Sequence, residues 1–165
     1  MKWNKKYHYP SSTRSIHEGF RHYTLKNQML PSVTSIIEMT KTVREKEALA
    51  AWKSKLGAKE SSAISSAATK LGSEMHSNVE QFLLGKDNLN LFEDKKEKSK
   101  PRMMSDLIIE EGLRDKLEEI HGVECVLYYP GPKGFAGSAD LIGMYSGVHS
   151  VIDLKSKSSI MKENY

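Results

Sequence analysis

Two runs rich in Val, Ile, Leu and Tyr flank Ser146 and Gly147 in the stretch GFAGSADLIGMYSGVHSVIDLKSK, residues 134–157. Short apolar runs bounded by glycine and separated by a Ser-Gly pair are typical of a β-hairpin with a two-residue turn. A turn at these two residues pairs Tyr145 with Val148. Because the register of a strand pair decides which face each side chain occupies, this hairpin constrains the fold more than any other stretch.

Continuing the same register outward brings Asp140 opposite Asp153, and Lys155 joins Asp153 on that face two positions later. Two opposed carboxylates destabilise a strand pair unless something compensates, and a hard divalent cation is the usual compensator. Such a cation polarises a phosphoryl oxygen and lowers the pKa of a bound water, while Lys155 could stabilise the charge that develops on phosphorus. The pattern therefore predicts phosphodiester hydrolysis. The alternative is an ordinary solvated strand face, since Asp-x-Lys occurs by chance in many sequences.

The order of the expected elements is several helices followed by three consecutive strands. Helical patterns begin after the N-cap Ser32 and recur over residues 46–56, 67–84 and about 105–121, and strand patterns cover 123–129 and the hairpin. This order indicates an α/β or mixed α+β fold with helices against one sheet. We divide the chain into an extended arm, a helical part with a polar loop at 86–102, and a core, over residues 1–30, 31–103 and 104–165.

The net charge is +4 and the pI is near 9.0, a basic balance that favours an anionic partner such as nucleic acid. The single cysteine, Cys125, excludes an internal disulfide framework and cysteine-only metal sites, and it favours a reducing compartment. No apolar run approaches the roughly 20 residues that span a membrane, and there is no P-loop for a nucleoside triphosphate. We expect a cytoplasmic protein, in the host cytoplasm if viral. A mitochondrial matrix location is less favoured than the cytoplasm. The first fifteen residues are basic, but they lack the arginine-rich amphipathic helix of a transit peptide.

Three separated motifs carry a family resemblance. They are Leu30-Pro31-Ser32-Val33-Thr34, Gly72-Ser73-Glu74-Met75-His76, and Asp140 followed by Asp153-Leu154-Lys155. In this order they resemble the PD-(D/E)xK nuclease superfamily, and more narrowly its RecB-like exonuclease branch, which includes mitochondrial genome maintenance exonuclease and phage exonucleases. The resemblance runs from about residue 20 to the end. The single cysteine excludes the iron-sulfur members of the branch.

This resemblance implies a restriction-endonuclease-like core after a helical N-terminal part. It also implies an exonuclease dependent on Mg²⁺ or Mn²⁺ that hydrolyses DNA, with single-stranded ends as substrate, in replication, recombination or repair. Carried over by position, Asp140 and Asp153 are metal ligands, Leu154 supplies a carbonyl ligand and Lys155 is the catalytic lysine. His76 is then an imidazole ligand or a group near the scissile phosphate.

Four further groups have weaker assignments. Glu80 lies one helical turn after His76 and either orients it or forms a simple surface pair. Glu124 matches an acidic position near the metal in many family members, but the strand phase does not tell whether it faces the site. Possible DNA contacts are the hydroxyls of Ser32 and Thr34 at a helix start, and Ser156 with Lys157 after the lysine. Ser32 also serves as a plain N-cap, and the residues after Lys155 also suit a polar loop.

Two alternatives to an exonuclease stay open. One is a catalytically inactive DNA-binding module that keeps the nuclease fold, and the other is a partner-binding helical protein with an incidental hairpin. The family continues past the lysine into a further helix and strand, so we expect this chain to be truncated at its C-terminus. That truncation puts the activity of the 165-residue piece in question.

Overall fold

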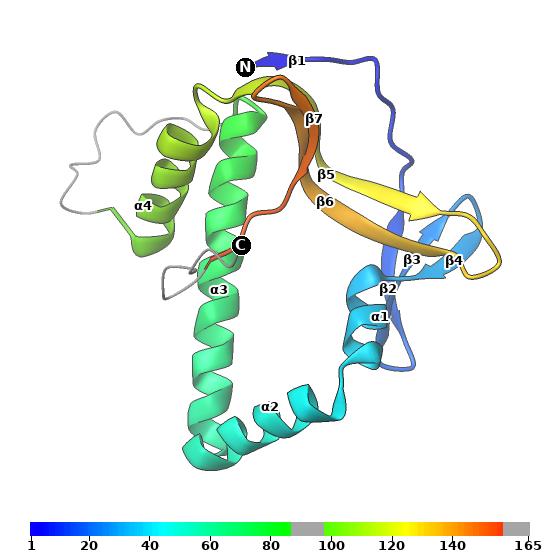
Figure 1. Cartoon of the computed structure of the whole chain (residues 1–165), viewed down its shortest axis with the longest axis vertical. Coiled ribbons are helices and arrows are strands. Elements are labelled where there is room, and N and C mark those ends of the chain that lie inside the picture. The colour runs from blue at the N-terminus through cyan, green and yellow to red at the C-terminus, as the bar shows by residue number, and fades with distance from the viewer. Residues whose placement is uncertain (87–97, 157–165) are drawn as a thin grey trace.

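The computed structural model describes residues 1–86 and 98–156 of the chain. It has a mixed α+β architecture (Figure 1). The helices are α1 (Val33–Thr40), α2 (Val43–Leu56), α3 (Ala58–Leu83), α4 (Lys100–Leu107) and the π-helical segment η1 (Ile108–Leu113). The strands are β1 (Lys2–Trp3), β2 (Thr13–His17), β3 (Phe20–Leu25), β4 (Gln28–Pro31), β5 (Leu117–Tyr129), β6 (Phe135–Tyr145) and β7 (Val148–Ile152).

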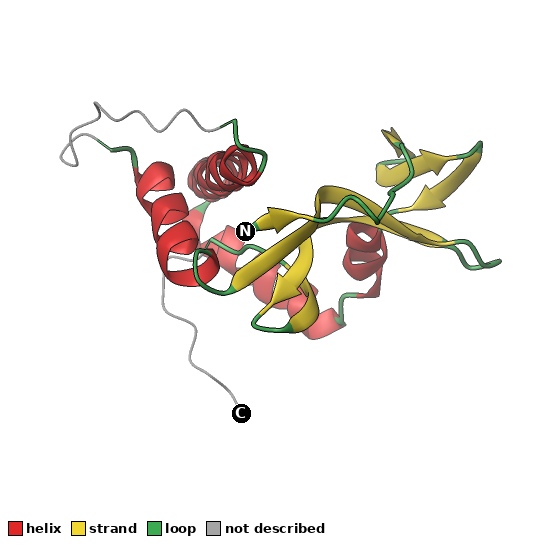
Figure 2. Ribbon diagram, turned by 90° about the horizontal axis from the view of Figure 1, so that it is seen from above, coloured by secondary structure: helices red, strands yellow, loops and turns green. Residues whose placement is uncertain are grey.

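The hairpin predicted from the sequence is present as β6 and β7. Tyr145 pairs with Val148, and the ladder continues to Leu141 opposite Ile152, which is the predicted register. Ser146 and Gly147 both have positive φ, as a tight two-residue hairpin turn requires. These strands belong to a sheet of order β1-β5-β6-β7, in which β1 is parallel to β5 and the other pairs are antiparallel. Figure 2 shows the strands in yellow and the helices in red.

The main hydrophobic core lies between this sheet and α3, the long helix in Figure 1. Met75 and Val79 on α3 are fully buried, and they belong to one cluster with Ile120 of β5 and Leu141 of β6. Burial of apolar surface of this kind is the main stabilising contribution to a domain. The core therefore fixes α3 against the two strands that carry acidic residues.

The helices predicted after Ser32, over 46–56 and over 67–84 correspond to α1, α2 and α3, although α3 begins earlier, at Ala58. The helix predicted over 105–121 is wrong beyond Leu113, because β5 begins at Leu117. Leu113, Leu117 and Ile120 have helical spacing, which suggested a continuous helix. In the structure, a register shift in β5 between Leu117 and Glu119 lets Leu117 and Ile120, three apart, enter the same core.

Residues 1–30, expected to be an extended arm, form strands that pair. β2, β3 and β4 form an antiparallel sheet whose two turns lie at positive-φ residues, Glu18-Gly19 and Lys26-Asn27. A second hydrophobic cluster joins Ala136 of β6 to three buried residues of this sheet, Tyr23, Leu25 and Leu30. The N-terminal strands therefore support the far end of β6 instead of extending freely into solvent.

The N-terminal strand β1 is attached to β5 through Glu119. Asn4 Nδ2 donates to Glu119 Oε2 at 2.7 Å, and His121 Nε2 lies 3.2 Å from the same oxygen. The hydrogen bond from Asn4 and that from His121 hold the pKa of the Glu119 carboxyl below its usual value. Its ionised form is therefore favoured in the folded state.

This contact gives a pH-dependence of stability with a defined sign. Because the folded pKa of Glu119 is lower than the unfolded one, the carboxylate stabilises the fold above about pH 4.3 and loses that contribution as the pH falls through the folded pKa. We expect the melting temperature to fall less between pH 7 and pH 3 in Glu119→Gln than in the wild type. Thermal denaturation at both pH values measures this, with the exposed Glu111→Gln as control. Equal losses in wild type and Glu119→Gln would contradict the assignment.

In the part of the chain that the structure describes, no helix combines the length and the apolar character needed to cross a membrane.

Candidate metal centre

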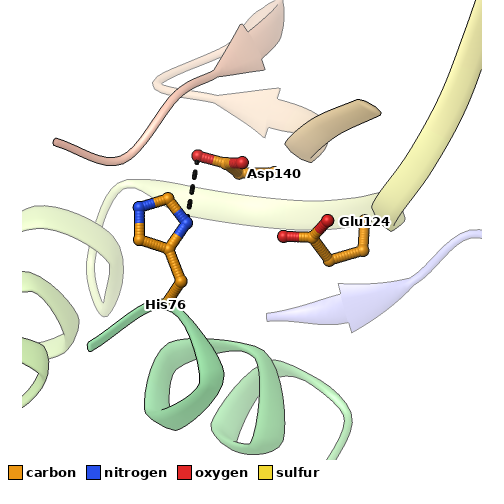
Figure 3. Close-up of side chains that lie close together, drawn as sticks. All are labelled: His76, Glu124 and Asp140. Atoms are coloured by element: carbon orange, nitrogen blue, oxygen red, sulfur yellow. Dashed lines mark ion pairs between the residues drawn. The ribbon is translucent and has the colours of Figure 1, made fainter. Parts of the chain in front are cut away.

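Three side chains from three different elements converge beside the core. They are His76 of α3, Glu124 of β5 and Asp140 of β6, and one potential ligand atom of each lies within 4.8 Å of the other two (Figure 3). His76 Nδ1 is 3.5 Å from Asp140 Oδ2, with the two side chains 28% and 15% exposed. The cluster is therefore partly shielded from solvent but still reachable from it.

The packing of α3 positions the histidine. Its neighbour Met75 is fully buried in the main core, so His76 lies at the border of the buried helix face. Gly72, one turn earlier, lies against the segment that follows β7, and a Cβ on it would come 3.1 Å from Ser156 Oγ. The spacing of Gly72 and His76 thus has a physical reason, because the glycine leaves room for this segment.

The pairing of β5 with β6 positions the two acids. The pairs Val123–Leu141 and Cys125–Ala139 bracket Glu124 and Asp140, which therefore stand opposite each other. Glu124 has φ +50°, in the left-handed region that a glutamate rarely adopts. Such strain is often found at functional sites, where the surrounding structure maintains it.

Hydrogen bonds orient both carboxylates. The backbone N–H of Leu154 donates to Asp140 Oδ2 at 2.7 Å, and Ser138 Oγ donates to Glu124 Oε2 at 3.0 Å. Each carboxylate oxygen carries two lone pairs, so both acids can accept these hydrogen bonds and still bind a further partner. The segment after β7 is thereby attached to Asp140, and Leu154 itself is buried in the main core.

The donor set fits a divalent cation. Two ligands at about 2.1 Å from one ion lie about 3.0 Å apart at a right angle and about 3.4 Å apart at a tetrahedral angle. The 3.5 Å between His76 Nδ1 and Asp140 Oδ2 is close to this range. Cys125, next to Glu124, is an unsuitable ligand, because burial foremost, and then the charge of Glu124, raise the pKa of its thiol.

Asp153 and Lys155 lie beside this group, outside it. The last pair of the ladder is Leu141–Ile152, so Asp140 and Asp153 occupy the next positions of the same register. Among the described residues, the group within 4.8 Å contains no oxygen of Asp153. Lys155 Nζ instead pairs with the Asp153 carboxylate at 2.8 Å, with both side chains mostly exposed. Their roles as second metal ligand and catalytic lysine stay predictions.

The remaining predicted residues are distributed around the cluster. Glu80 lines a hollow of about 330 Å³ together with His76 and Glu124, and the carbonyl role of Leu154 stays a prediction. Ser32 is 1% exposed and caps α1, since its Oγ accepts from the Ser35 N–H at 3.0 Å. Thr34 is exposed, and Lys157 lies outside the described residues.

Glu124 is the member of the cluster that sequence reasoning left open. The strand phase grouped it with Val126 and Tyr128 but did not say which face carries the site. The available signal was its distance from the β5–β6 turn, because a register that opposes Tyr129 to Phe135 also opposes Glu124 to Asp140.

Comparisons of the chain with models of protein families, with curated proteins and with solved structures found no match.

Proposed function

We propose that this protein is a divalent-metal-dependent nuclease that hydrolyses phosphodiester bonds of DNA. The observation that carries the proposal is the convergence of His76, Glu124 and Asp140 next to the Asp153-Leu154-Lys155 segment. The resemblance of these residues to the RecB-like exonuclease branch narrows the proposal to an exonuclease acting on single-stranded ends. The same resemblance supports a restriction-endonuclease-like core. The single cysteine, Cys125, supports a reducing compartment, for which we propose the cytoplasm, or the host cytoplasm if the protein is viral.

Each residue near the cluster has a part in this proposal. A cation bound by His76, Glu124 and Asp140 would polarise a phosphoryl oxygen and lower the pKa of a coordinated water. The amide of Leu154 holds the Asp140 carboxylate in place through its 2.7 Å hydrogen bond. Lys155, beside Asp153, supplies a positive charge for the phosphate as negative charge develops on it.

The composition of the cluster bears on the choice of ion. Carboxylates suit Mg²⁺ and Mn²⁺ alike, whereas an imidazole suits the softer transition metals better than Mg²⁺. Because His76 contributes an imidazole nitrogen, we propose that Mn²⁺ supports the reaction better than Mg²⁺. The net charge of +4 is consistent with an anionic polymer as substrate.

A cleavage assay tests this function. A single-stranded oligonucleotide labelled at one end is incubated with the protein and Mn²⁺, Mg²⁺ or EDTA, and a second oligonucleotide is blocked at both ends. We expect shortening of the open oligonucleotide with Mn²⁺, slower shortening with Mg²⁺, none with EDTA, and none of the blocked substrate. Binding without cleavage in any metal would overturn the proposal in favour of the inactive DNA-binding module. Cleavage in EDTA would overturn the metal mechanism.

A further inference from the structure

A second hollow, of about 420 Å³, lies along β6 where β7 no longer pairs with it. The β6–β7 ladder ends at Leu141, and among the described residues no strand pairs with this side of β6 from Asp140 toward Phe135, apart from a bridge between Ser32 and Ala136. The hollow runs along this open side. It is therefore a feature of the same two strands that carry the acidic cluster.

Its lining is apolar and aromatic at one end. Tyr128, Tyr129 and Phe135 line it, and they are 38%, 55% and 40% exposed. The rings of Tyr129 and Phe135 form a tilted pair with centroids 5.7 Å apart. Large aromatic side chains that remain this exposed on a small domain mark a binding surface more often than isolated exposed residues do.

The Tyr129 ring lies close to the turn that joins β5 to β6. A Cβ on Gly131 would come 2.5 Å from Tyr129 Cε1, so the glycine permits the ring to lie over the turn. A ring placed in advance loses little conformational entropy when a ligand stacks on it. This arrangement suits a planar ligand.

The other end of the hollow is acidic and adjoins the candidate metal centre. Asp140 and Asp153 line it there. Phe135 lies five residues before Asp140 on β6, a separation of about 17 Å along the strand. One ligand that reaches from the cluster to the rings must therefore be elongated, with an anionic group that a cation can hold and a planar group some distance away.

We propose that this hollow is a base-binding subsite, in which an unpaired nucleobase of single-stranded DNA stacks on Tyr129 and Phe135 while a phosphate a few nucleotides away lies at the metal centre. The inference rests on the proposed nuclease function. In a duplex each base face is covered by its neighbours, whereas an unpaired base offers a free π-face to an aromatic side chain. The subsite thus gives a physical reason for a preference for single strands.

Equilibrium binding tests the subsite apart from catalysis. Fluorescence anisotropy of a labelled single-stranded oligonucleotide is measured with Ca²⁺ for the full chain, Tyr129→Ala and Tyr129→Phe. Base stacking on an aromatic side chain contributes about 1–3 kcal/mol, so we expect Tyr129→Ala to bind about 5- to 150-fold more weakly and Tyr129→Phe to bind like the wild type. Trp52→Ala is the matched control, because Trp52 is 37% exposed on α2 and does not line the hollow.

An oligonucleotide with abasic sites isolates the base contact. Abasic substitution is expected to weaken binding by the wild type more than binding by Tyr129→Ala, which keeps only the Phe135 ring of the pair. Equal binding by wild type and Tyr129→Ala, or an equal effect of abasic sites on both, would overturn the subsite. Absence of binding by the wild type would overturn it as well.

The two proposals fail in different ways. Failure of the subsite leaves Mn²⁺-dependent shortening of the oligonucleotide intact in Tyr129→Ala. Failure of the nuclease proposal removes that cleavage from the wild type while the anisotropy differences between the variants remain.

Discussion

Asp140→Asn is expected to reduce metal-dependent cleavage of single-stranded DNA about 10³-fold, because a bound cation contributes several kcal/mol to the stabilisation of the transition state. A carboxylate oxygen of Asp140 lies within 4.8 Å of a potential ligand atom of each other member of the cluster, so its charge acts directly on a cation held there. Asparagine keeps an oxygen that can accept the Leu154 N–H, so the 2.7 Å hydrogen bond can be retained. The variant therefore removes the charge with little change in shape. Initial rates at saturating Mn²⁺ measure the effect.

The control for this variant is Asp115→Asn, which makes the same chemical change at an exposed position between η1 and β5. We expect its cleavage rate to match that of the wild type. The melting temperature of Asp140→Asn is compared with that of the wild type to separate lost chemistry from lost folding. Cleavage by folded Asp140→Asn at the wild-type rate would contradict the assignment of Asp140 as a ligand.

Met75→Ala is expected to lower the free energy of unfolding by about 2–5 kcal/mol, the cost of a cavity in a packed core. Met75 is fully buried and belongs to the cluster that joins α3 to β5 and β6. Because its neighbour His76 is positioned by the same packing, we expect weaker Mn²⁺ binding in the fraction that remains folded. Urea denaturation measures the stability, and a Mn²⁺ titration of the folded protein measures the second effect.

Met39→Ala provides the matched control, because Met39 is 60% exposed on α1. Its free energy of unfolding should change by less than about 0.5 kcal/mol. A similar cost for the two substitutions would contradict the account of the core. Met75→Leu, which conserves volume, should cost less than about 1.5 kcal/mol.

The hairpin could be predicted from sequence because its information is local. The Ser146-Gly147 turn sets the register, and each residue outward follows by alternation, as the observed pairs from Tyr145–Val148 to Leu141–Ile152 confirm. The order of helical and strand patterns along the sequence predicted the mixed α+β class, and the structure confirms it. The more specific restriction-endonuclease-like core stays a proposal.

The errors arose where residues buried by tertiary packing have a sequence spacing that is typical of a different secondary structure. Leu117 and Ile120 have helical spacing, yet they face the core from a strand with shifted register. The small sheet of β2, β3 and β4 was missed because its turns use Glu18-Gly19 and Lys26-Asn27, and only part of its apolar set, such as Tyr23, is buried. The local sequence pattern carries no information about the long-range pairing that stabilises these strands.

The candidate site was predicted in part for the same reason. His76 lies near Asp140 because α3 packs against β6. The resemblance suggested that the two residues share a site, and in the structure His76 Nδ1 is 3.5 Å from Asp140 Oδ2. The position of Glu124 depends on the β5–β6 register and on its left-handed backbone, neither of which was derived from sequence. For Asp153 the register of β6 and β7 was predicted correctly and places it beside Asp140. Its carboxylate is nevertheless not in the group whose ligand atoms lie within 4.8 Å of one another.

The central claim is that His76, Glu124 and Asp140 together hold one cation. Anomalous diffraction from crystals of the protein grown with Mn²⁺ tests it most directly. We predict a single strong manganese peak about 2.0–2.3 Å from a ring nitrogen of His76 and from a carboxylate oxygen of each acid. The absence of a peak there at saturating Mn²⁺, with the three side chains well ordered, would contradict the claim.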